Sequence, residues 1–451
     1  MRIHGVRAVT LDQIAFLGLC AAIMFGGVSA AAQQATKPAA PSVALRCGRL
    51  LDVRTGKLAA DQVIAIDGSK IAGVFSATTY KPGAGVNLID LGTATCLPGL
   101  LDMHTHLTDP GEGDYDASRP LRRSGAQAAF DAIPNAKATL LAGFTTVRDV
   151  GTFRAFVDVA LRDAVDAGIV PGPHIVPAGA YVTISGGAGA LTGYAPDVEL
   201  PLELRYGVAD GPDKVRERVR EIIRHGAGVI KVLSTGAVLT LHSQPGAQEF
   251  TEDELRAAVE EANKAGLRVA CHAHAPAGIK AAIRAGVNSI EHGSFLDEES
   301  IQMMKQHGTY LVPDTYDDEV ILATKSYPAE YLAKERIAGE AQRTGLRRAL
   351  QVGVKIAFGT DAAVIPHGDN GKQFQSYVKL GMTPLFAIQT ATINAADLLG
   401  WSDRVGAIEP GKLADVIAVE GDPLQNVRLL ENVQFVMKDG AVYKNTLPAP
   451  R

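Results

Sequence analysis

The chain has 451 residues, of which 47% are hydrophobic and 21% are charged, and its formal net charge is -5 at pH 7. These values describe a globular protein that is long enough for two or three domains around a large core. The mild charge, and the lack of a basic cluster interleaved with aromatic residues, argue against a nucleic-acid-binding protein.

The first 32 residues are predicted to be a signal peptide. Arg2 and Arg7 precede an apolar run over residues 14–28, and small residues continue to Ala32. The run has the length of a signal peptide and is short for a membrane span. We therefore expect cleavage after Ala32 and an exported mature protein, periplasmic or secreted, without membrane association. The alternative is an uncleaved N-terminal anchor.

Three cysteines lie beyond the predicted cleavage site, namely Cys47, Cys96 and Cys271. They are too few and too scattered to form a disulfide framework. Cys47 and Cys96 flank one small region and could pair in an oxidising compartment. We favour two buried thiols, with the disulfide as the alternative.

The two ends of the mature chain are predicted to form one small β-sandwich domain. Residues 33–42, rich in alanine, proline and polar residues, are expected to be a flexible leader. Short strands separated by turns are then predicted within residues 43–96, and the same style returns within 401–447. The predicted strands span 44–51, 62–67, 70–74, 86–90, 415–419, 433–438 and 441–444.

Between these ends, residues 97–400 repeat a helix that ends at glycine and is followed by a short apolar strand. The predicted helices span 133–141, 156–167, 214–224, 251–264, 277–285, 298–306 and 344–351. The strands after them span 145–149, 174–177, 229–233, 268–272, 288–292, 309–312 and 354–358. With the strand that begins near Leu97, eight strands alternate with helices, which predicts a (β/α)8 barrel inserted into the β domain. A doubly wound open sheet is the alternative, but no glycine-rich dinucleotide loop follows the first strand.

Polar residues follow several of these apolar strands, at the end where such barrels carry their catalytic groups. His104 and His106 end the first strand and point to the same side, because side chains alternate along a strand. Further candidates are Lys231 in the fourth strand, His272 at the end of the fifth, His292 at the end of the sixth and Asp361 after the eighth. Each alone fits an ordinary structural role, but their arrival at one face predicts a metal centre.

Charge counting suggests how such a centre would be built. Two divalent cations bound by four neutral imidazoles need anionic ligands, whereas the ammonium group of Lys231 would repel them. A carbamate formed from Lys231 and CO2 would instead offer two anionic oxygens, and Asp361 adds a carboxylate. Zinc suits these mixed ligands, with cobalt or manganese as alternatives. Such a metal pair lowers the pKa of a bridging water and polarises a substrate carbonyl.

Several motifs resemble those of the metal-dependent amidohydrolase superfamily. They are Pro-Gly-Leu-Leu-Asp-Met-His-Thr-His (98–106), Ile-Lys-Val-Leu-Ser-Thr-Gly (230–236), Ser-Ile-Glu-His-Gly (289–293), Phe-Gly-Thr-Asp-Ala-Ala (358–363) and the segment 405–419. The resemblance covers residues 43–445. Within the superfamily the chain is similar to the branch of imidazolonepropionase-like proteins and Xaa-Pro or Xaa-Arg dipeptidases, and to ochratoxin-hydrolysing amidohydrolases. The motif around Lys231 favours the members with two metals.

The resemblance implies a role for each candidate ligand. His104, His106 and Asp361 bind the more buried metal, and carbamylated Lys231 bridges both. His272 and His292 bind the second metal, with His274 as the alternative to His272. One departure concerns the substrate: many relatives carry Gly-Gly-His after the third strand, where this chain has Gly-Gly-Ala (186–188).

The sequence therefore predicts an amide hydrolase with two metal ions that acts by attack of metal-bound hydroxide, with Asp361 as general base and acid. We expect a homo-oligomer that cleaves dipeptides or N-acyl amino acids, including aromatic amides of the ochratoxin type. Candidate substrate contacts are His367, His274, Tyr194 and His242. One alternative is a hydrolase of the same fold that acts on a cyclic amide, carbamate, lactone or phosphotriester. The other is a non-catalytic protein that binds metal or a solute.

Overall fold

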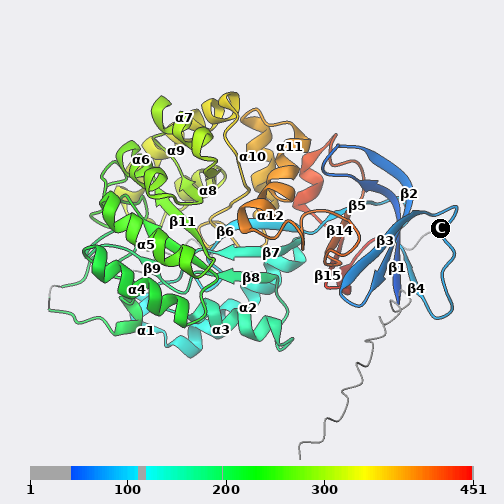
Figure 1. Ribbon diagram of the computed structural model, residues 1–451, viewed down its shortest axis with the longest axis horizontal. Coiled ribbons are helices and arrows are strands. Elements are labelled where there is room, and N and C mark those ends of the chain that lie inside the picture. Colours follow the sequence, from blue (N-terminus) through cyan, green and yellow to red (C-terminus); the bar gives the residue numbers. More distant parts are fainter. Residues whose placement is uncertain (1–41, 110–117, 196, 449–451) are drawn as a thin grey trace, which may run out of the picture. The chain divides into compact units, whose positions relative to one another are not determined.

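The computed structural model describes residues 42–109, 118–195 and 197–448 (Figure 1). Helices and strands alternate over much of the chain, so the fold is mixed α/β. The predicted signal peptide, and all but the last residue of the predicted leader, lie outside the described residues. In the part of the chain that is described, no helix is long and apolar enough to cross a membrane.

An eight-stranded sheet joins the two ends of the chain. Its order is β16-β15-β14-β5-β1-β2-β3, and β4 also pairs with β1. The strands are β1 (Val43–Leu51), β2 (Leu58–Asp67), β3 (Lys70–Ser76), β4 (Asn87–Asp90), β5 (Thr95–Pro98), β14 (Val416–Val419), β15 (Phe435–Lys438) and β16 (Ala441–Asn445). β5 makes the join, because it runs parallel to β1 and antiparallel to β14. In Figure 1 the blue strands and the orange-red strands form this sheet together. Its arrangement as a β-sandwich stays a prediction.

A disulfide bond links Cys47 on β1 to Cys96 on β5. The favoured expectation of two buried thiols is therefore wrong. The physical reason is the parallel pairing of β1 with β5, which brings the two Cα atoms to 5.9 Å although 49 residues separate them in sequence. Cys271 is a free and buried thiol.

Gly99 connects β5 to β6 (Leu100–Thr105), the strand that carries His104. Its N–H donates a hydrogen bond to the carbonyl oxygen of Asp415 at 2.9 Å. A Cβ atom at this position would collide with the side chain of Thr145 on the neighbouring strand. The Pro-Gly pair therefore lets β6 enter the interior directly beside the eight-stranded sheet.

The middle of the chain contains two further sheets with parallel strands. One has the order β6-β7-β8 and the other β13-β12-β11-β10-β9. The strands are β7 (Phe144–Asp149), β8 (His174–Pro177), β9 (Tyr181–Val182), β10 (Val229–Leu233), β11 (Arg268–Ala273), β12 (Ser289–His292) and β13 (Tyr310–Val312). Most of their residues are buried, as expected for parallel strands covered by helices. All the strands predicted between residues 145 and 312 are present, and β9 is an additional short one.

The predicted eighth strand, 354–358, is not a regular strand. This segment forms one isolated parallel bridge, between Leu311 of β13 and Ile356. On its other side the N–H of Met103 in β6 donates to the carbonyl of Phe358 at 2.8 Å. The segment is hydrogen-bonded to a strand on each side, but the bonds are too few and too irregular to form a ladder. Strand pairing alone thus shows two sheets and no closed barrel.

The seven predicted helices are present with longer or shifted ends, as α2 to α7 and α9, and the described residues contain further helices that were not predicted. They are α1 (Arg119–Arg122), α2 (Gly125–Leu141), α3 (Val157–Asp166), α4 (Pro212–Arg224), α5 (Glu252–Lys264), α6 (Pro276–Ala285), α7 (Glu298–His307), α8 (Asp317–Ala323), α9 (Ala329–Val352), α10 (Gln373–Lys379), α11 (Pro384–Thr390) and α12 (Ile393–Leu399), with 3-10 turns η1 (Leu202–Leu204), η2 (Asn370–Lys372) and η3 (Val427–Glu431). A capping box opens α5, where Thr251 and Glu254 exchange side-chain to backbone hydrogen bonds. α9 ends at Gly353, as predicted, and this glycine adopts the left-handed conformation, but α9 begins well before the predicted residue 344.

Candidate metal centre

All six predicted metal ligands line one cavity of about 370 Å³ at the carboxyl ends of the parallel strands. They are His104, His106, Lys231, His272, His292 and Asp361. β6, β10, β11 and β12 carry Lys231 and most of the histidines, while His106 and Asp361 lie just beyond β6 and the 354–358 segment. The structure therefore brings together residues that are up to 257 positions apart in sequence.

One group of possible ligands consists of His104, His106 and Asp361. The Oδ1 atom of Asp361 lies 3.1 Å from Nε2 of His106 and 3.5 Å from Nε2 of His104. The ligand atoms of the three residues all lie within 4.8 Å of one another. Two imidazole nitrogens and a carboxylate oxygen are a donor set that divalent transition metals accept.

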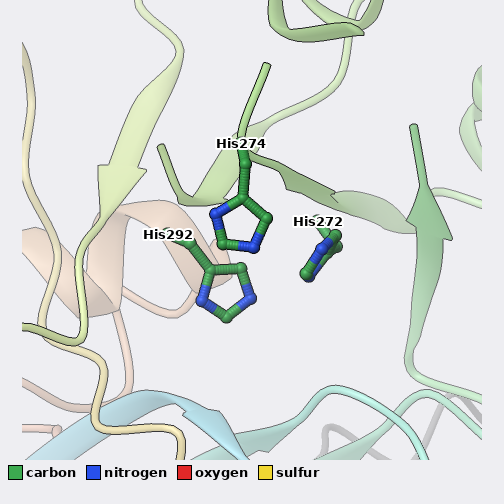
Figure 2. A group of neighbouring side chains, drawn as sticks. All are labelled: His272, His274 and His292. Carbon is green, nitrogen blue, oxygen red and sulfur yellow. The ribbon is translucent and has the colours of Figure 1, made fainter. Parts of the chain in front are cut away.

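A second group consists of His272, His274 and His292 (Figure 2). The ring centroid of His292 lies 4.5 Å from that of His272 and 5.0 Å from that of His274. Figure 2 shows the three rings gathered around one space. His272 on β11 and His274 just after it are thus both near enough to His292 to share a metal ion with it. The choice of His272 over His274 stays a prediction.

Hydrogen bonds fix the outer nitrogen of three of these imidazoles. Nδ1 of His292 lies 2.6 Å from a carboxylate oxygen of Asp314, Nδ1 of His104 lies 3.0 Å from Glu291, and Nδ1 of His106 lies 2.8 Å from the carbonyl oxygen of Gly151. Carboxylate and carbonyl oxygens accept, so each Nδ1 donates, and in the neutral imidazole that a metal requires Nε2 keeps its lone pair. This is the arrangement that orients histidines toward a metal.

Sequence reasoning did not identify these outer partners. Glu291 is fully buried and accepts hydrogen bonds from Arg148 at 2.8 and 2.9 Å, so a buried ion pair stands behind His104. Asp314 is also held by the Nε2 atom of Gln342 at 2.6 Å. The only sequence signal was the presence of charged residues in buried strands or directly after them, such as Arg148 in Thr-Thr-Val-Arg-Asp.

Lys231 lies in the middle of the buried strand β10, and only 2% of it is exposed. Among the described residues no hydrogen bond or ion pair reaches its Nζ atom. Burial lowers the pKa of this lysine, which favours the neutral amine. The neutral amine is the form that reacts with CO2, so the environment suits a carbamate.

Asp361 adopts a positive φ of 53°, an uncommon conformation for a residue other than glycine. Burial raises the pKa of its carboxyl group, but the neighbouring His104 and His106 outweigh this and hold the pKa well below its ordinary value. The group is therefore ionised at neutral pH, as a metal ligand or a proton acceptor requires. Strain of this kind is often found at functional sites.

The structure separates the predicted substrate contacts into two sets. Tyr194 and His274 line the cavity. His242 is exposed and His367 faces the carbonyl oxygen of Asp109 at 3.2 Å, and neither belongs to the cavity wall. Burial lowers the pKa of His367 to about 4, so this imidazole is neutral at physiological pH. The geometry gives no support to substrate contacts by His242 and His367, which stay predictions.

Known proteins resemble this chain over most of its length. The model of the amidohydrolase family matches residues 95–444. Ochratoxinase from Aspergillus niger is 33% identical over 369 residues, which cover 77% of this chain and 75% of that protein. An imidazolonepropionase from Geobacillus kaustophilus is 25% identical over 402 residues, covering 80% and 84%. A solved Xaa-Pro dipeptidase with methionine in its active site is 38% identical, with a TM-score of 0.84 over 89% of this chain and all of that one. The resemblance inferred from the motifs is confirmed.

Replacement of Asp314 by asparagine tests the outer partners. The Asp314→Asn variant loses the charged acceptor of His292 and should bind zinc about 10–100-fold more weakly. Competition with a chelator measures this affinity. Asp397→Asn is the control, because that carboxylate accepts from Tyr310 and does not line the cavity. Unchanged zinc affinity in a folded Asp314→Asn variant would contradict the role of Asp314 in orienting His292 as a metal ligand.

Proposed function

Because the chain belongs to the amidohydrolase family, we propose that it is a hydrolase with two metal ions that cleaves dipeptides or N-acyl amino acids and releases the C-terminal amino acid. The family and the similar proteins make it a hydrolase that acts on amide bonds of a small-molecule substrate. The observation that carries the finer proposal is the pair of ligand groups in one cavity, with Lys231 in the same cavity wall and close enough to influence both His104 and His272 electrostatically.

The proposed architecture is a (β/α)8 barrel over residues 97–400 inserted into a β domain formed by 43–96 and 401–447. Hydrogen bonds beyond the regular ladders support it. The N–H of Gly228 before β10 donates to the carbonyl of Pro177 in β8 at 2.7 Å. On the other side, residues 354–358 bond both β13 and β6. Together these contacts would complete the ring of strands.

The donor atoms fit two divalent metal ions, for which we propose zinc. His104, His106 and Asp361 would hold one ion, His272 and His292 the other, and the carbamate of Lys231 would bridge them. Imidazole nitrogens and carboxylate oxygens suit zinc, and the family is generally metal-dependent. When bound, such a pair supplies Lewis acidity toward a carbonyl oxygen and lowers the pKa of water.

Asp361 is proposed to move the proton that amide cleavage requires. Its ionised carboxylate faces the cavity, where it can accept a proton from the attacking water. The same group can then donate this proton to the leaving amine nitrogen, since an amide anion leaves poorly. Acid–base help of this kind typically contributes about 10²–10⁴-fold.

Arginine side chains in the cavity wall are proposed to hold the carboxylate of the released amino acid. Arg119, Arg123 and Arg154 all line the cavity. Arg123 pairs with Asp131, and one Nη atom of Arg154 donates to the carbonyl of Pro120 at 2.9 Å. Guanidinium groups suit carboxylates. The similarity to ochratoxinase supports aromatic amides of the ochratoxin type as specific candidates.

We also propose that the protein is exported. The predicted signal peptide motivates this, and the disulfide between Cys47 and Cys96 supports it, because disulfides persist in oxidising compartments.

Matched substrates test the carboxylate site and the reaction together. Zinc-loaded protein should hydrolyse N-acyl amino acids and dipeptides in a panel that also contains lactones and phosphotriesters. Arg154→Gln should raise KM for a free acid at least about tenfold, because a hydrogen bond to a charged group contributes about 1.5–3 kcal/mol. KM for its methyl ester should change less. Equal changes for acid and ester would exclude Arg154, and the same comparison with His367→Ala tests that histidine.

Substitution of Asp361 by asparagine tests the proton transfer. Asp361→Asn keeps the shape and one oxygen donor but cannot accept the proton, so kcat should fall at least about 10²-fold. Metal content and single-turnover rates should be measured on one preparation. A variant that keeps its metal and near-normal turnover would eliminate Asp361 as the proton carrier.

A further inference from the structure

Two carboxyl groups in the cavity wall have no part in the proposed metal centre. Asp317 begins α8 and Glu335 lies on α9, and both line the cavity. They are almost completely buried, with 7% of Asp317 and 5% of Glu335 exposed. Buried acidic side chains are rare unless a partner compensates for the loss of water, so both require an explanation.

Glu335 lacks such a partner. Within the described part of the chain, no hydrogen bond or ion pair reaches its carboxyl group. The nearby cations are engaged elsewhere: Lys334 donates to the carbonyls of Thr240 and Ser243 at 2.8 and 3.1 Å, and Arg343 pairs with Asp318. A buried carboxyl group that faces a cavity without a counterion is a place for a cationic ligand group.

Asp317 extends this acidic wall toward the metal centre. One of its oxygens accepts the N–H of Asp318 at 2.7 Å, and its carboxylate lies within 4.8 Å of the ligand atoms of Asp314 and Asp361. Burial, followed by the charges of Asp314 and Asp361, raises the pKa of Glu335 to about 8. Mutual repulsion among these carboxyl groups would be relieved by a positive charge placed between them.

The chemistry of a dipeptide places a positive charge at this position. Its α-ammonium nitrogen is two bonds from the carbon of the scissile carbonyl, a distance of about 2.5 Å from standard bond lengths. The group that binds this ammonium must therefore lie beside the residues that act on the carbonyl. Asp317 meets this requirement through its closeness to Asp361, and Glu335 lies in the same wall. An N-acyl group would leave both carboxyl groups unpaired.

We propose that Asp317 and Glu335 form a subsite for the α-ammonium group of the substrate, so that the enzyme selects dipeptides with a free amino terminus over N-acyl amino acids. This inference rests on the proposed function and divides its two substrate classes. The arginines of the cavity would hold the carboxylate at the other end of the dipeptide.

The test uses two substrates that differ only in the ammonium group, alanyl-phenylalanine and propionyl-phenylalanine. Zinc-loaded wild-type protein should have a kcat/KM for alanyl-phenylalanine at least about tenfold above that for propionyl-phenylalanine. Glu335→Gln should lower kcat/KM for the dipeptide about 10–100-fold, as expected for the loss of a charged hydrogen bond. Its value for propionyl-phenylalanine should stay within about twofold of wild type.

Glu330→Gln is the matched control, since Glu330 lies on the same helix, pairs with Lys334 and is not part of the cavity wall. It should leave both substrates unaffected. The wild-type comparison needs no variant, so a misfolded Glu335→Gln protein does not weaken the test. Equal wild-type rates for the two substrates, or an equal loss on both in Glu335→Gln, would overturn the subsite alone. Hydrolysis of neither substrate would overturn the proposed function and the subsite with it.

Discussion

The fold must stabilise several ionisable groups that are buried together at the carboxyl ends of its parallel strands, and the rest of the structure depends on this constraint. Five imidazoles, a lysine and several carboxyl groups share one cavity, and such groups are costly to bury without oriented neighbours. The outer nitrogens of His104, His106 and His292 donate to acceptors, so the inner nitrogens face the cavity. The buried pair of Arg148 and Glu291 stands behind this arrangement, and breaking such a pair typically costs about 3–5 kcal/mol. The side chains of the candidate metal centre are therefore held in place by groups of the buried core.

The ends of the chain support this construction from outside. β5 joins strands from both ends into one sheet, the disulfide ties β5 to β1, and Gly99 passes the chain directly from β5 into the strand of His104. The first strand of the cavity thus starts from a rigid position. The first candidate metal ligand, His104, lies only eight residues after Cys96 because the sheet and the cavity share this connection.

Much of this was predictable because it follows from local patterns. Apolar runs bounded by glycine gave the parallel strands, and alternation along β6 placed His104 and His106 on one side. Features set by distant contacts were not predictable. The pairing of β1 with β5 brings the two cysteines of the disulfide together. Residues 354–358 form only isolated contacts with the strands beside them, so they lack a regular ladder. Glu291 and Asp314 are signalled only by their positions in a buried strand or directly after one, and Glu335 on α9 carries no local signal, since an acidic residue on a helix looks the same in sequence whether it faces water or a cavity. His367 lies near Asp361 in sequence, but its side chain contacts the carbonyl oxygen of Asp109 and is not part of the cavity wall.

The central claim is that Lys231 becomes an anionic ligand that joins two metal ions. Its burial on β10 without a hydrogen bond or ion pair to its Nζ atom, and its position in the cavity wall near both groups of histidines, lead to that claim. The most direct measurement is the ¹³C NMR spectrum of zinc-loaded protein prepared with ¹³C-labelled bicarbonate. The account predicts a protein-bound carbamate resonance at two zinc ions per chain, absent from Lys231→Ala. Wild-type protein that holds two zinc ions per chain and shows no such resonance would contradict it.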